Sequence, residues 1–115
     1  MLRRGKVSVW VGNMKSEEEL LSYVDDGTFS RDFDFTINTS FGRELKVEPD
    51  PVSLASLVIG FSSWQSFSEA VVKKGNEGGP RSATCMVILY AFDYIPSPRI
   101  NTNARLIYLG AFDFS

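Results

Sequence analysis

Two segments near the end of the sequence limit the possible folds more than any other feature. Residues 83–94 and 105–114 are long and apolar on both faces of an extended strand. Strands of that kind are central strands of a sheet that is covered by helices. We expect the helices to cover one face of this sheet. A loop containing Pro96 and Pro98 joins them. The two segments therefore predict an antiparallel hairpin within an α+β domain whose sheet is largely antiparallel.

The first half of the chain predicts a strand and a helix. Residues 7–11 alternate valine with Ser8 and Trp10, which is the period of a strand. The sequence SEEE at 16–19 is typical of a helix start, with the Ser16 hydroxyl capping a backbone N–H and Glu19 reaching back. We expect this helix to end near residues 26–27. Residues 33–37 alternate like a strand, residues 29–32 could instead form a helical turn, and residues 45–48 suit an edge strand.

Two further helices are expected in the middle of the chain. Asp50 followed by Pro51 is a good helix start, and an apolar run continues to Ile59. A second helix is predicted over residues 63–74, with Gly75 following it. The expected order is β-α-β-α-α-β-β in a single domain over residues 1–115, with residues 1–5 as a flexible tail.

Composition excludes several classes of active site. The chain of 115 residues contains no histidine and only one cysteine, Cys85. Catalytic triads that use histidine, an intramolecular disulfide and a thiolate metal cluster are therefore ruled out, and no cofactor is expected. No apolar run is long enough for a signal peptide or a membrane span, so we expect a cytoplasmic location. Cys85, Trp10 and Gly12 suit structural roles: a buried thiol, a core aromatic and a strand-to-helix turn.

The charge is unevenly distributed along the chain. Residues 13–50 hold ten acidic and four basic residues, although the whole chain has a net charge of only −2. Acidic surfaces repel nucleic acid and accelerate encounters with basic proteins. The acidic block therefore favours a protein partner over nucleic acid, unless it serves only as a solvated face.

Two pairs of aspartates are candidates for catalytic carboxylates, Asp93 with Asp113 and Asp32 with Asp34. In the expected hairpin, Asp93 faces Arg105, and Asp93 and Asp113 would lie more than about 20 Å apart. They therefore cannot act together. Asp32 and Asp34 would share one face of a strand, at a spacing compatible with a carboxylate-dependent hydrolase.

Several segments resemble the immunity 22 family of bacterial polymorphic toxin systems. The resemblance is most specific at residues 7–13 (VSVWVGN) and 15–20 (KSEEEL), followed by Tyr23 and Val24. It continues at Asp32 and Phe33, at residues 61–67 (FSSWQSF), and at the closing segments 87–94 and 109–114. The resemblance implies a small cytoplasmic α+β protein without enzymatic activity that neutralises a cognate toxin domain. We expect the chain itself to be a monomer or a weak homodimer.

A partner surface follows from this resemblance together with the charge distribution. Nuclease toxins are often basic, so an acidic inhibitor would complement one electrostatically. We expect the contact to involve seven acidic residues: Glu18, Asp25, Asp26, Asp32, Asp34, Glu44 and Glu48. Two alternatives remain, a small hydrolase that uses Asp32 and Asp34, and a structural or regulatory interaction subunit.

Overall fold

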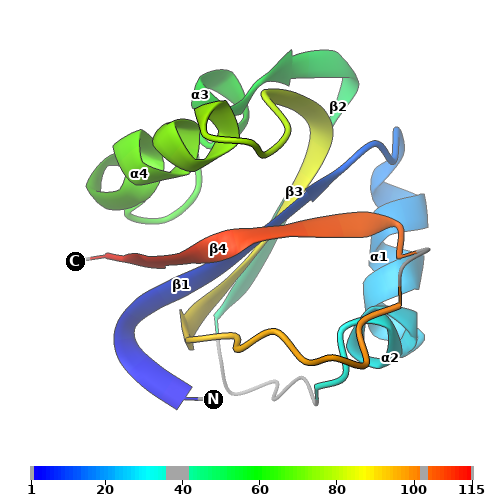
Figure 1. Ribbon diagram of the computed structural model, residues 1–115. Helices are drawn as coiled ribbons and strands as arrows, with labels where there is room; N and C mark the ends of the chain where they lie inside the picture. Colours follow the sequence, from blue (N-terminus) through cyan, green and yellow to red (C-terminus); the bar gives the residue numbers. More distant parts are fainter. Residues whose placement is uncertain (1, 36–41, 102–103, 115) are drawn as a thin grey trace.

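The protein is an α+β domain built on one four-stranded antiparallel sheet, as the sequence predicts (Figure 1). The structure is a computed structural model, and it describes residues 2–35, 42–101 and 104–114. The elements in chain order are β1 (Leu2–Gly12), α1 (Glu17–Asp25), α2 (Thr28–Asp32), β2 (Arg43–Ser53), α3 (Leu54–Leu57), α4 (Trp64–Asn76), β3 (Ser82–Phe92) and β4 (Leu106–Asp113).

The strand order differs from the expected hairpin. The sheet runs β2-β3-β1-β4, so β3 and β4 both pair with β1 and not with each other. β1 can take this central position because it is apolar on both faces, with Val9 and Trp10 both fully buried. The expected Asp93–Arg105 cross-strand pair is therefore wrong. Arg105 instead lies 3.1 Å from Glu19 of α1.

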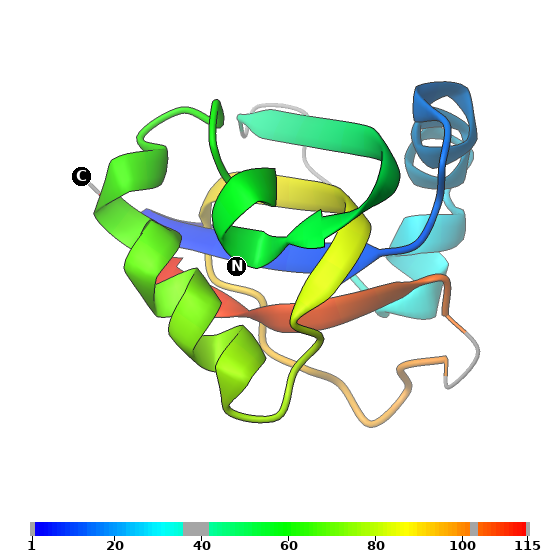
Figure 2. The same cartoon turned by 90° about the horizontal axis from the view of Figure 1, so that it is seen from above.

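Helices cover both faces of the sheet, not one face as expected. The valines of β1, together with Met86 and Ile88 of β3, pack against α3 and α4. Trp10, with Val87 and Leu89 of β3, packs against α1 and α2. Figure 2 looks down on α3 and α4 lying over the strands. Because both central strands alternate between two apolar faces, each face needs its own cover.

The chain is ordered into the sheet almost from its start. β1 begins at Leu2, which pairs with Phe92 across an irregularity in register between Leu2 and Val7. Residues 2–5 are therefore strand backbone and not the expected tail.

The region after α1 forms a short helix, and the strand expected at residues 33–37 does not form over the residues of that range that the structure describes. α2 ends at Asp32, and Asp34 has a φ of 55°, which breaks the extended backbone. The rest of that expected strand, residues 36 and 37, lies outside the described residues. The helical alternative is correct because Phe29 and Phe33, one helical turn apart, both reach the core beside Trp10.

The two middle helices also begin and end at other residues than expected. Asp50 and Pro51 belong to β2, where an edge strand tolerates proline. α3 is a single turn that begins after Ser53, whose side chain accepts a hydrogen bond from the Ser56 N–H at 3.2 Å. α4 extends to Asn76, so Gly75 lies inside the helix, where an added Cβ would meet Leu54 at 2.6 Å.

Gly12 is required for close packing and not for a turn. It does not have a positive φ, but a Cβ there would lie 2.9 Å from the Arg105 carbonyl oxygen and 2.7 Å from Leu106 Cδ2. We expect Gly12→Ala to lower the free energy of unfolding by about 1–3 kcal/mol in urea titrations, because backbone must move. Gly42→Ala is the matched control, since its Cβ would lie 3.4 Å from Tyr90 Cβ. Equal stability of the two variants would contradict this packing role.

Candidate functional site

The outer side of α1 is the most acidic exposed surface among the described helices. Ser16 caps the helix as predicted, accepting a hydrogen bond from the Glu19 N–H at 3.0 Å. The first turn carries Glu17, Glu18 and Glu19, which the positive end of the helix dipole stabilises. Asp25 and Asp26 extend the negative charge at the other end of the helix. All five carboxylates are exposed.

A hollow of about 450 Å³ lies beside this surface. Its lining contains three carboxylates and one guanidinium, and in full consists of Ser16, Glu18, Glu19, Ser22, Tyr23, Asp26, Thr28 and Arg105. Arg105 lies against Glu19, which leaves Glu18 and Asp26 as the other acidic groups of the lining. We call α1's exposed acids and this hollow the α1 acidic surface. An ammonium or guanidinium group from a partner is the chemistry that it fits.

Asp25 and Asp26 each have a local partner. Asp25 forms an ion pair with Arg43 of β2 at 2.7 Å. Asp26 accepts a hydrogen bond from the Thr28 N–H at 2.8 Å. Hydrogen bonds from the Thr28 side chain and backbone lower the pKa of the Asp26 carboxyl.

Asp32 is a structural carboxylate. It is only 8% exposed and accepts hydrogen bonds from the Tyr23 hydroxyl at 2.6 Å and from Asn101 Nδ2 at 2.9 Å. Burial, and then the bond to Asp32, raise the pKa of Tyr23. Asp32 thereby joins α1, α2 and the segment before β4, and it does not contribute to an exposed surface.

The geometry expected of a catalytic pair at Asp32 and Asp34 is absent. Asp32 ends a helix, and Asp34 follows with a left-handed backbone and accepts a hydrogen bond from Ser97 Oγ at 2.7 Å. The two residues do not share a strand face, which was the basis of the hydrolase alternative.

Glu44 is held within the fold by hydrogen bonds that the sequence did not reveal. Its Oε1 accepts from the Ser62 N–H at 2.7 Å and from the Tyr90 hydroxyl at 2.9 Å, and its Oε2 accepts from Ser62 Oγ at 2.6 Å. Burial opposes ionisation most strongly, yet these hydrogen bonds together outweigh it and lower the pKa of Glu44. The FSSWQSF segment therefore supplies the residue that fixes this carboxylate.

A depressed pKa links Glu44 to acid stability. Its stabilisation is fully present above the ordinary pKa of 4.5 and is lost as pH falls through the lower pKa of the folded state. We expect Glu44→Gln to cost about 1–2 kcal/mol at neutral pH and the difference from wild type to shrink below pH 4.5. Urea titrations across this range measure it, with Glu69→Gln as the exposed control. A difference that does not vary with pH would contradict the linkage.

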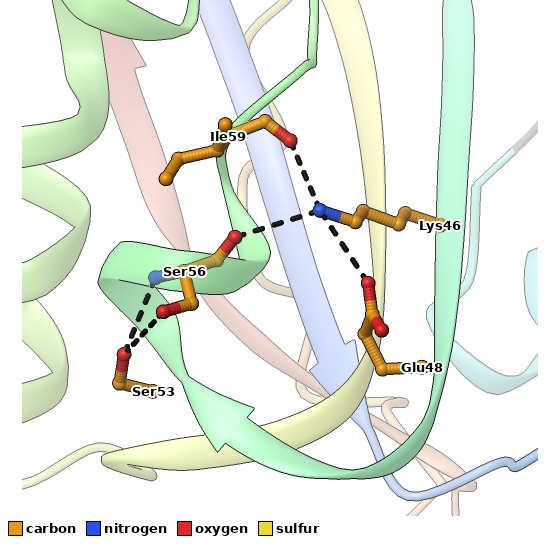
Figure 3. Close-up of polar contacts among 5 residues, drawn as sticks. All are labelled: Lys46, Glu48, Ser53, Ser56 and Ile59. Atoms are coloured by element: carbon orange, nitrogen blue, oxygen red, sulfur yellow. Dashed lines mark hydrogen bonds and ion pairs between the residues drawn. The ribbon is translucent and has the colours of Figure 1, made fainter.

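Glu48 belongs to a small polar cluster between β2 and α3 (Figure 3). Its carboxylate lies 3.6 Å from Lys46 Nζ. The same ammonium donates to the carbonyl of Ser56, in α3, at 3.5 Å and to the carbonyl of Ile59, which follows α3, at 3.0 Å. Lys46 therefore satisfies carbonyls at a helix end, a common role for lysine. Glu48 balances its charge.

Other expected features can be located within the described residues. No group of three or more potential metal-ligating side chains is found in that part of the chain. Cys85 is buried, as predicted, and burial raises the pKa of its thiol. None of the described helices is both long and apolar enough to cross a membrane.

The structure brings together only part of the predicted acidic set. Glu18, Asp25 and Asp26 lie on or beside α1, whereas Asp32 and Glu44 hold tertiary contacts. Asp34 and Glu48 bond to Ser97 and Lys46. Arg105 lies far from α1 in the sequence, and no local pattern indicated it. The chain matches no family model, no curated protein and no solved structure.

Proposed function

We propose that this protein is an immunity protein, which binds a cognate toxin domain in the bacterial cytoplasm and neutralises it by non-covalent contact. The α1 acidic surface is the observation that carries the proposal. Its exposed carboxylates include Glu18 and Asp26, which line one hollow. The resemblance of residues 7–13 and 15–20 to immunity proteins supports the same assignment. The second of these segments contains the capped start of α1, which carries part of the acidic surface.

The electrostatics of this surface suit a basic partner. An acidic surface steers a basic protein into encounter and raises the association rate at low ionic strength. A lysine or arginine of the toxin that enters the hollow would meet the carboxylates of Glu18 and Asp26. Arg105, at the rim of the same lining, would limit where the positive charge can sit. A basic nuclease is therefore the toxin class that this surface fits best.

Co-expression is the test of this proposal. The candidate toxin is the product of the neighbouring gene, expressed from an inducible promoter with or without this protein. We expect growth to stop with the toxin alone and to continue when this protein is present. A toxin that still arrests growth would contradict the proposal. Isolation of a stable native complex with a non-toxin protein would favour a structural or regulatory subunit instead.

A further inference from the structure

The two edges of the sheet differ in how they are protected against pairing. β2 carries charged residues and two prolines, features that discourage a further strand: Arg43, Glu44, Lys46, Glu48, Pro49 and Pro51. β4 forms the opposite edge (Figure 2). From Leu106 to Phe112 it contains no charged residue and no proline. β4 therefore lacks the charged residues and prolines that protect β2, and the one interruption of its edge is a bulge at Leu109.

The outer side of β4 is open to a further strand. Within the described residues, the backbone hydrogen bonds of 106–112 run to β1 alone. Ile107 is 52% exposed, although it is a large apolar residue on a strand. A hollow of about 640 Å³ lies against it, lined also by Lys74, Pro80 and Tyr108. The edge thus combines unpaired backbone groups with an exposed apolar side chain.

We propose that β4 pairs antiparallel with β4 of a second copy of this chain, joining the two sheets into one. Charge selects this occupant. Arg105 immediately precedes β4 and Asp113 ends it, with uncharged residues between. Antiparallel pairing brings Arg105 of each copy near Asp113 of the other, whereas parallel pairing would bring like charges together. The Arg105 side chain contacts Glu19 and the Asp113 side chain contacts Lys6, yet both Arg105 and Asp113 remain more than half exposed.

The irregularity in β4 is compatible with this pairing. Val9 pairs with Gly110 and Trp10 with Tyr108, so Leu109 is an extra residue at the middle of β4. A two-fold axis at this bulge lays the first half of one β4 on the second half of the other. Leu109 and Phe112 both face α3 and α4, and Ile107 precedes Leu109 by two residues. A register that keeps these faces places Ile107 opposite Phe112 of the second copy.

Sedimentation of the full chain from about 1 µM to about 1 mM, a span that covers weak dimers, tests this pairing. We expect the mass to approach twice 12.8 kDa at the upper end. Ile107→Lys should raise the dissociation constant about tenfold or more by placing an unpaired charge in the edge. Ile59→Lys is the matched control, because Ile59 is 49% exposed away from β4, and it should still dimerise.

A charge exchange provides the second arm. Arg105→Asp should weaken the dimer, and the double variant Arg105→Asp with Asp113→Arg should restore it, with circular dichroism to verify folding. A wild-type chain that stays monomeric throughout would overturn the proposal, as would a dimer that Ile107→Lys leaves unchanged. If the chain is monomeric and Ile107→Lys abolishes binding of the toxin, the edge receives a partner's strand and the dimer is excluded.

Discussion

Replacing Trp10 by alanine is expected to lower the free energy of unfolding by about 3–5 kcal/mol, more than Gly12→Ala or Glu44→Gln. Trp10 is fully buried on β1. Five aromatic rings surround it at centroid distances of 4.9–5.8 Å: Phe29, Phe33, Phe35, Tyr94 and Tyr108. These rings come from α2, from β4 and from the segments that follow α2 and β3. Loss of the indole would leave a cavity where these elements meet.

Replacing Trp10 by phenylalanine shows whether the loss of stability comes from lost side-chain volume or from a lost hydrogen bond of the indole. The indole Nε1 is buried and has no hydrogen-bond partner within the described residues. Trp10→Phe therefore removes no hydrogen bond to the part of the chain that the structure describes, and we expect it to cost less than half as much as Trp10→Ala. Urea titrations followed by circular dichroism measure both variants, with Trp64→Ala as a control at a half-buried site. Equal costs for alanine and phenylalanine would contradict the packing explanation.

Reversing two charges on the α1 acidic surface should have the largest effect on binding. Glu18→Lys combined with Asp26→Lys replaces two carboxylates of one hollow by ammonium groups. We expect the dissociation constant for the toxin to rise about 100-fold or more, and the salt dependence of association to weaken. Calorimetric titration at two ionic strengths measures both changes.

The matched control for this reversal lies on α4 and its end. Glu69→Lys with Glu77→Lys changes the net charge by the same amount at exposed positions away from α1. It should leave affinity within a few-fold of wild type. Equal losses in the two double variants would mean that net charge, and not the α1 acidic surface, determines binding.

Local patterns predicted the elements that depend on neighbouring residues. Ser16 caps α1 as expected, and the two apolar segments near the end of the chain are β3 and β4. The pairing order could not be predicted in the same way. The alternating apolar pattern at residues 7–11 is compatible with a strand at the edge of the sheet or at its centre. The structure has it at the centre, where Val9 packs into the core on one face of the sheet and Trp10 into the core on the other.

Whether an acidic residue is exposed or held by hydrogen bonds depends on partners that are distant in the sequence. Tyr90 reaches Glu44 across 46 positions, and Asn101 reaches Asp32 across 69. Nothing near either carboxylate marks it as buried or hydrogen-bonded. The exposed acids of α1 were the predictable part, because a capped amphipathic helix places them on its outer side.

Titration of purified toxin activity with this protein tests the proposed function most directly. The toxin's activity on its own substrate is measured while the protein is added up to and beyond equimolar amounts. The proposal predicts that activity falls in proportion and is abolished near equimolar addition, with the Glu18→Lys, Asp26→Lys variant requiring a large excess. Full toxin activity in the presence of excess folded wild-type protein would contradict it.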